Sequence, residues 1–85
     1  MAKYSIRITK PAQKELDKLS DKLAEPILHA IADLAFDPRP HGYKKLKGLN
    51  GYRIRVGDYR IIYQIIDTIL LVKVINVGHR KDIYD

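Results

Sequence analysis

The sequence predicts a small α+β domain in which two N-terminal helices pack on one face of a mainly antiparallel four-stranded sheet. Three observations support this fold class. Apolar and polar residues alternate over 3–9, two helical stripes of apolar residues follow within 11–34, and alternating or apolar runs after residue 51 are separated by short turns. The resulting order β-α-α-β-β-β packs most simply as a layer of helices on a sheet. Eighty-five residues without repeats or linkers make one domain, residues 1–85.

The two helices follow directly after the first predicted strand. Pro11 suits the first position of the first helix, because its missing amide hydrogen would be unsatisfied there in any case. Ser20 or Asp21 can cap the second helix, whose apolar stripe extends to residue 34. Pro26 lies within that stripe, so we expect the second helix either to kink or to begin near this proline.

A β-hairpin at residues 52–66 is the most informative local pattern. Gly57 is the first of two central residues between its strands, which suits a type II′ turn. Such a turn places Arg55 opposite Arg60, with Arg53 on the same face of the sheet. Apolar and aromatic side chains alternate with these arginines and are expected to face the helices. They are Tyr52, Ile54, Val56, Tyr59, Ile61 and Tyr63.

The predicted last strand, residues 69–77, determines which residue lies opposite Arg60. A two-residue turn at 67–68 would place Arg60 opposite Ile75, so that the tail leaves the sheet just beyond that end. We therefore expect the tail residues His79, Arg80 and Tyr84 to reach the arginine-bearing face.

The positive charge of the chain is concentrated around the hairpin and the loop before it. The formal net charge is +6, and residues 39–60 hold seven lysines and arginines against one aspartate, which gives +6 for this segment alone. Like charges directly opposite each other destabilise a sheet, so the facing arginines indicate an anionic ligand. The planar guanidinium group suits phosphate, which makes nucleic acid the first candidate. An ordinary solvated hairpin face is the alternative interpretation.

Several classes of protein and site are disfavoured by the sequence. Cysteine is absent, which excludes disulfides and thiolate metal sites. The three histidines are widely spaced, so we expect neither a metal ion nor a cofactor. No apolar run has the length of a signal peptide core or a membrane span, and no basic amphipathic helix suggests membrane binding. We therefore expect a cytoplasmic protein without a membrane partner.

With these features in order, the chain resembles the RelE/ParE toxin superfamily, and the RelE-like mRNA interferases in particular. Four segments carry the resemblance, which extends over nearly the whole chain. They are Lys45-Leu46-Lys47-Gly48-Leu49, Tyr52-Arg53-Ile54-Arg55-Val56-Gly57, Asp58-Tyr59-Arg60-Ile61-Ile62-Tyr63 and Gly78-His79-Arg80-Lys81-Asp82-Ile83-Tyr84. The resemblance implies a RelE-like fold and a type II toxin that cleaves translated mRNA in the ribosomal decoding site. It also implies a RelB-like antitoxin partner and a toxin–antitoxin hetero-oligomer.

The resemblance also assigns roles to individual residues. Arg53 and Arg55 match the basic pair that binds mRNA and rRNA phosphates, and Arg60 matches a basic residue near the scissile phosphate. Arg80 matches an arginine assigned to charge stabilisation, and Tyr84 looks like the proposed general base. His79 stands where relatives carry a basic residue, and it is the other candidate for proton transfer. Lys44, Lys45 and Lys47 are expected to attract phosphate, and Lys45 and Lys47 are the expected RNA-binding residues of this loop.

Two other functions stay open on the sequence alone. A ParE-like toxin would poison DNA gyrase by binding it, without ribonuclease chemistry, and would not need the cluster of arginines and Tyr84. A non-catalytic RNA- or ribosome-binding module would use the basic face only for positioning.

Overall fold

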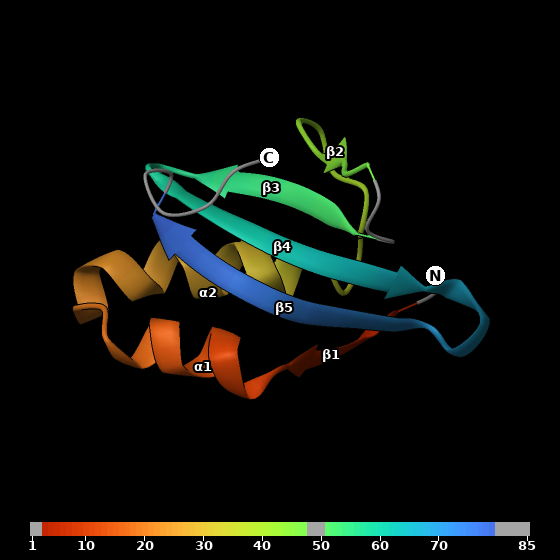
Figure 1. Ribbon diagram of the computed structural model, residues 1–85. Helices are drawn as coiled ribbons and strands as arrows, with labels where there is room; N and C mark the ends of the chain where they lie inside the picture. The colour runs from red at the N-terminus through yellow and green to blue at the C-terminus, as the bar shows by residue number, and fades with distance from the viewer. Residues whose placement is uncertain (1–2, 48–50, 80–85) are drawn as a thin grey trace.

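A computed structural model describes residues 3–47 and 51–79 of the chain. In this part of the chain two α-helices and a 3-10 turn accompany a five-stranded sheet with the order β1-β5-β4-β3-β2 (Figure 1). The elements are β1 (Ser5–Ile8), α1 (Lys10–Asp17), α2 (Asp21–Asp33), β2 (Lys44–Lys45), β3 (Tyr52–Val56), β4 (Tyr59–Ile66), η1 (Asp67–Ile69) and β5 (Leu71–His79). Strand β1 pairs with β5 in parallel, and the other pairs are antiparallel. The predicted α+β fold is therefore confirmed.

The predicted number of four strands is wrong, because the basic loop contains the short fifth strand β2. Its two lysines pair with the first two residues of β3, Lys44 with Arg53 and Lys45 with Tyr52. Lysine has a low strand propensity, and two residues are too few to show an alternating pattern. Sequence periodicity could therefore not detect this strand.

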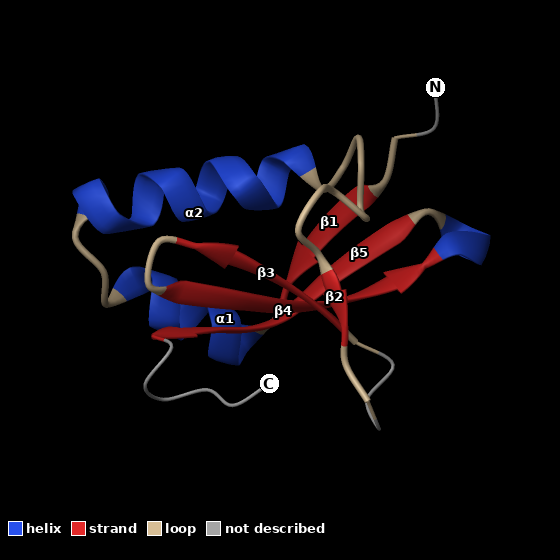
Figure 2. Cartoon of the chain, turned by 90° about the horizontal axis from the view of Figure 1, so that it is seen from above, coloured by secondary structure: helices blue, strands red, loops and turns tan. Residues whose placement is uncertain are grey.

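Both helices begin close to the predicted positions. Pro11 lies in the first turn of α1, and the Ser20 hydroxyl oxygen caps α2 by accepting a hydrogen bond from the Leu23 amide at 3.3 Å. Helix α2 begins at Asp21 and continues through Pro26, so the proline does not mark its start. Figure 2 shows α2 lying alongside the twisted sheet.

The core lies between the two helices and the sheet face that they cover. Both helices and the three central strands contribute to one buried cluster, in which Ile61, Tyr63, Val72 and Val74 are fully buried. The Tyr63 hydroxyl still donates a hydrogen bond, to the Pro38 carbonyl at 2.7 Å, and burial raises the pKa of this phenol above its ordinary value. All six side chains of the hairpin that were expected to face the helices belong to the cluster or pack against it.

The first hairpin has the predicted register. Val56 pairs with Tyr59, and Arg55 pairs with Arg60. Gly57 has a φ of +58°, and Asp58 is not among the described residues with a positive φ. A positive φ at the first central residue alone is the signature of the type II′ turn.

The second hairpin differs from the prediction, because Arg60 lies opposite Gly78 and not Ile75. The connection between β4 and β5 consists of η1 followed by Leu70, which has a left-handed backbone with a φ of +49°. This longer turn shifts the register by two residues. An irregularity in the pairing at Ile62/Tyr63 shifts it by one more.

A polar cluster joins four segments at the end of the sheet that holds the β4–β5 turn, away from the pair Arg55–Arg60. Arg39 donates a hydrogen bond to Asp67 at 3.0 Å and lies over the ring of Tyr52, and the Tyr4 hydroxyl also donates to Asp67. The hydrogen bonds from Arg39 and Tyr4 hold the pKa of Asp67 below its ordinary value. The cluster ties the segment after α2 to the β4–β5 turn, and that segment leads into the basic loop.

Candidate functional site

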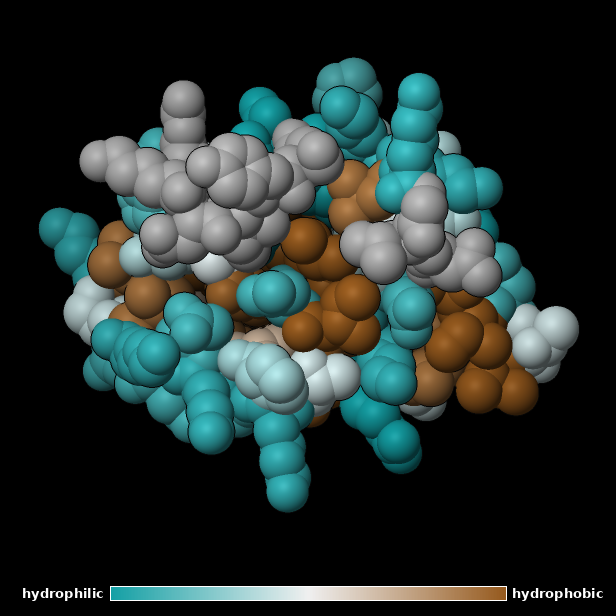
Figure 3. Space-filling view, viewed as in Figure 1, coloured by the Kyte–Doolittle hydropathy of each residue, from teal (hydrophilic) through white to brown (hydrophobic). Residues whose placement is uncertain are grey.

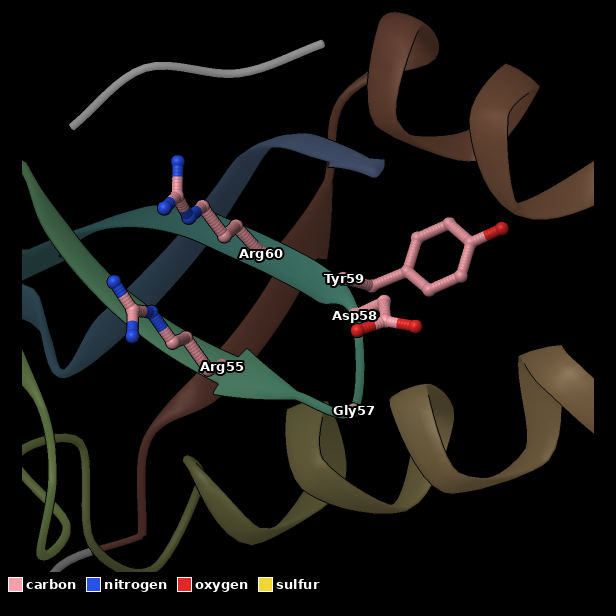
Figure 4. Close-up of a pocket in the computed structure, with 5 residues that line it drawn as sticks. All are labelled: Arg55, Gly57, Asp58, Tyr59 and Arg60. Atoms are coloured by element: carbon pink, nitrogen blue, oxygen red, sulfur yellow. The ribbon is translucent and has the colours of Figure 1, made fainter. Parts of the chain in front are cut away.

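The two arginines at the end of the first hairpin lie side by side on the sheet face opposite the helices. Arg55 and Arg60 are direct cross-strand partners, and both alternate with core residues along their strands. Figure 4 shows their guanidinium groups on the same side of the hairpin, whereas Asp58 and Tyr59 point away from them. Arg55 is exposed and Arg60 is half-buried. Two cations in register on an accessible surface form a candidate site for an anion.

A shallow cavity accompanies this pair. Its volume is about 140 Å³, and it is lined by both arginines and by the turn residues Gly57, Asp58 and Tyr59. Its size suits a phosphate group better than a large organic ligand. A second cavity, of about 570 Å³, also borders Arg55. It lies between the end of α2, the segment after α2 and β3, and both apolar and polar residues line it: Ala30, Asp33, Leu34, Asp37, Pro40, His41, Gly42 and Ile54. Arg55 therefore lies at the boundary between a small polar site and a larger groove of mixed polarity.

The observed register of the second hairpin places Gly78 of β5 directly opposite Arg60 of β4. A glycine has no side chain, so nothing projects from that position onto the outward face beside Arg60. The sequence resemblance included this glycine, but only the actual register shows that it adjoins the arginine pair.

The expectation that Arg53 lies on an open face is wrong. Its side chain is only 6% exposed, because β2 pairs with β3 at this level and Arg53 lies between the cross-strand neighbours Lys44 and Ile62. Arg55 lies beyond the end of β2 and stays accessible. The alternation placed both arginines on the correct face, and the unrecognised strand explains their different exposure.

The lysines of the basic loop lie at the β2 edge of the sheet. Lys44 lies opposite Arg53 and so shares the outward face, whereas Lys45 lies opposite Tyr52 and shares the face of the helices. Lys47 is exposed after the end of β2. The sequence favoured Lys45 and Lys47 through the resemblance, but Lys44 is the lysine of this strand that is on the face of the arginines.

His79 does not reach the arginine face, contrary to expectation. It pairs with Tyr59 across β4 and β5, and the two rings meet edge to face with 5.4 Å between their centroids. Tyr59 packs against the core, so His79 is on the helix side of the sheet. The other two predicted tail residues, Arg80 and Tyr84, lie outside the described residues.

The fold and this face together define a small basic α+β domain with a candidate anion site at one hairpin. Comparison with known proteins identifies the family of this domain. The sequence model of the family described as the ParE toxin of type II toxin–antitoxin systems matches residues 6–84. Toxin RelG of Mycobacterium tuberculosis is 36% identical over 83 residues, which cover 95% of each chain. The mRNA interferase toxin RelE of Escherichia coli K12 is 32% identical over 81 residues, or 92% of this chain and 84% of the relative.

Solved structures show the same fold. The archaeal RelE–RelB complex from Pyrococcus horikoshii OT3 contains a chain that matches with a TM-score of 0.81 and 29% identity, over 94% of this chain and 97% of that one. The chain therefore belongs to the ParE toxin family of type II toxin–antitoxin systems, and its relatives place it in the RelE-like branch of the RelE/ParE superfamily. No helix in the described part of the chain is long and apolar enough to cross a membrane.

Proposed function

We propose that this toxin is a ribosome-dependent endoribonuclease that cleaves translated mRNA in the decoding site and thereby inhibits translation. The observation that carries the proposal is the cross-strand pair Arg55–Arg60, whose guanidinium groups flank a cavity of about 140 Å³ on an accessible face. A relative of 32% identity is named an mRNA interferase, which supports RNA as the substrate.

The RNA itself supplies the nucleophile in the proposed reaction. A 2′-hydroxyl attacks the adjacent phosphorus, the bond from phosphorus to the 5′-oxygen breaks, and a 2′,3′-cyclic phosphate and a 5′-hydroxyl result. The protein must hold the two oxygens in line and stabilise the negative charge that develops on the phosphorane. We assign that stabilisation to Arg60, together with Arg80 of the tail. Arg55 holds a neighbouring phosphate, and the buried Arg53 adds positive potential beneath it. Lys45 and Lys47 attract RNA at the sheet edge.

Two protons must also move during the reaction. The attacking 2′-hydroxyl loses one, and the leaving 5′-oxygen gains one. We assign the first transfer to Tyr84, because neighbouring guanidinium groups favour a phenolate by lowering the pKa of a tyrosine. Arg80 is the family's candidate for the second transfer. His79 is the alternative to Tyr84, and its contact with Tyr59 on the helix side of the sheet favours a packing role instead.

We further propose that a RelB-like antitoxin binds the toxin in a hetero-oligomer. The Pyrococcus horikoshii relative was solved as a RelE–RelB complex, which supports a partner of this kind. An antitoxin segment that is acidic would complement the basic face, and an amphipathic one would fit the groove of mixed polarity beside Arg55.

Inducible expression in a bacterial host tests the enzymatic proposal. We expect growth arrest together with new mRNA 5′ ends inside translated codons. Arg60→Ala should remove most of both effects, whereas Lys22→Ala on the exposed face of α2 should remove neither.

DNA damage with intact mRNA would contradict the proposal and favour a ParE-like action on gyrase. Growth arrest without cleavage of either nucleic acid would favour a binding module.

A further inference from the structure

The basic face extends beyond the hairpin to the opposite edge of the sheet. Arg7 of β1 pairs directly with Lys73 of β5, and Lys73 pairs with Gln64 of β4. Gln64 alternates with the core residues Tyr63 and Ile65, just as Arg60 alternates with Ile61. The row Arg7–Lys73–Gln64 therefore shares the outward face with Arg55 and Arg60.

Like charges face each other on this side of the sheet in three separate places. The direct cross-strand pairs are Lys44 with Arg53, Arg55 with Arg60, and Arg7 with Lys73. The pair of Arg7 with Lys73 is unfavourable without a compensating anion. None of the outward-facing strand positions in the described residues carries an acid, and neither Arg7 nor Lys73 has an ion pair with a described residue. A single phosphate at the hairpin would leave the distant pair uncompensated.

The spacing of the two accessible pairs suits an extended ligand. Arg60 and Gln64 are four residues apart, which is about 13 Å along a strand, and Lys73 lies one strand, or about 5 Å, to the side. The exposed Asn76 lies between the two rows, opposite the buried Ile62. Nucleotides that cross this gap would meet the Asn76 amide between two cationic pairs.

We propose that Arg7 and Lys73 form a second phosphate-binding site, which holds the RNA strand several nucleotides away from the phosphate at Arg55 and Arg60. The inference rests on the proposed function and adds the path of the RNA across the sheet, from the hairpin over Asn76 to the β1 edge. In the coloured part of Figure 3, hydrophilic and apolar residues lie side by side.

The test compares two double variants of equal charge. Arg7→Gln/Lys73→Gln removes the proposed site, and Lys14→Gln/Lys22→Gln removes two exposed helical lysines as a control. Binding to a single-stranded RNA tetranucleotide and dodecanucleotide is measured by fluorescence anisotropy over a series of salt concentrations, and thermal unfolding verifies the fold. We expect the first variant to lose affinity for the dodecanucleotide, with a salt slope lower by about 0.7 for the one lost phosphate contact. Its tetranucleotide binding and both affinities of the control should match those of the wild type.

The other outcomes separate this inference from the proposed function. If Arg7→Gln/Lys73→Gln binds the dodecanucleotide like the wild type while Arg55→Gln/Arg60→Gln loses both RNAs, the second site is wrong and the proposed function stands. If the wild type binds neither RNA, the second phosphate site is wrong, whereas the ribosome-dependent function still depends on the mapping of mRNA 5′ ends. If the Arg7/Lys73 variant loses only the binding of a glutamate dodecapeptide, the pair serves an acidic protein and the inference is overturned.

Discussion

Arg53 and Arg55 show how differently two neighbouring residues of one pattern can be used. Both belong to the motif Tyr-Arg-Ile-Arg-Val, and both point to the same face. The pairing of β2 buries Arg53 to 6% exposure and leaves Arg55 accessible. The first is therefore part of the packed structure, and the second is available to a ligand.

This difference predicts that the two substitutions change stability by unequal amounts. Arg53→Ala should lower the free energy of unfolding by about 1–3 kcal/mol, because it removes a side-chain stem packed beside Ile62 and leaves buried neighbours without contacts. Arg55→Ala should change it by less than about 0.5 kcal/mol, since that position is exposed and the facing Arg60 is relieved of a like charge. Urea denaturation of both variants measures this, and equal midpoints would contradict the assignment.

The proton transfer can be examined at single residues as well. Tyr84→Phe should slow single-turnover cleavage on programmed ribosomes by roughly 100-fold or more, the scale of a lost acid–base group, with little change in binding. His79→Gln should cost far less, because His79 contacts Tyr59 on the helix side of the sheet. The reverse order of effects would make the histidine the base. If neither substitution matters, the ribosome or the RNA itself must manage the proton.

At the scale of elements, the turn at Gly57 fixes the alignment of Arg55 with Arg60. Gly57 has a φ of +58°, and the space where a Cβ atom would project is open to 4 Å, so an alanine would meet backbone strain and not a clash. Gly57→Ala should therefore destabilise the protein by about 1–2 kcal/mol. Asp58→Ala, at the next position of the same turn, should cost much less. Chemical denaturation distinguishes the two, and equal losses would argue against the type II′ turn.

The cluster around Asp67 acts on several elements at once and should respond to pH. Its carboxylate has a lowered pKa because Arg39 and Tyr4 donate hydrogen bonds to it, so its contribution to stability is present above the unfolded-state pKa and is lost as the pH falls through the lower folded-state value. Asp67→Asn should melt below the wild type at neutral pH. This difference should begin to shrink as the pH falls below about 3.9, the ordinary pKa of an aspartate, and should vanish only below the lower folded-state pKa. Asp33→Asn, an exposed site on α2, is the control. A difference that persists in strong acid would contradict the ionic origin.

The sequence predicted the elements better than the connections between them. Alternation identified the hairpin, its turn, and the faces of Arg55 and Arg60, because one buried face imposes a period of two. It missed β2, which is too short and too rich in lysine to show a pattern. It also misjudged the β4–β5 connection, because a 3-10 turn and a left-handed Leu70 occupy sequence that lacks glycine. The pairing of Arg53 with Lys44 depends on β2, and the partner of Arg60 depends on the longer β4–β5 turn together with the irregularity at Ile62/Tyr63. The side of the sheet occupied by His79 depends on that irregularity alone, because a shift of one residue reverses the face and a shift of two keeps it.

For the whole molecule, charge is separated between the two layers. The outward face of the sheet carries the cationic pairs, whereas residues 10–38, which form the helices, hold six acids against four lysines. Such a distribution orients an approaching anion toward the sheet before contact is made. The same face would attract RNA and an acidic antitoxin segment, so the two ligands should compete.

This charge separation predicts how the antitoxin binds. A small protein with an acidic or amphipathic helical segment should be encoded beside the toxin, and its co-expression should restore growth. Its association rate should fall by about tenfold or more between low and high salt, because the encounter is steered by charge. Stopped-flow measurements should show slower association for Arg55→Gln/Arg60→Gln and an unchanged rate for Lys14→Gln/Lys22→Gln, which removes the same charge from the helices. An association rate independent of salt, or equal slowing in both variants, would mean that the basic face does not direct the antitoxin.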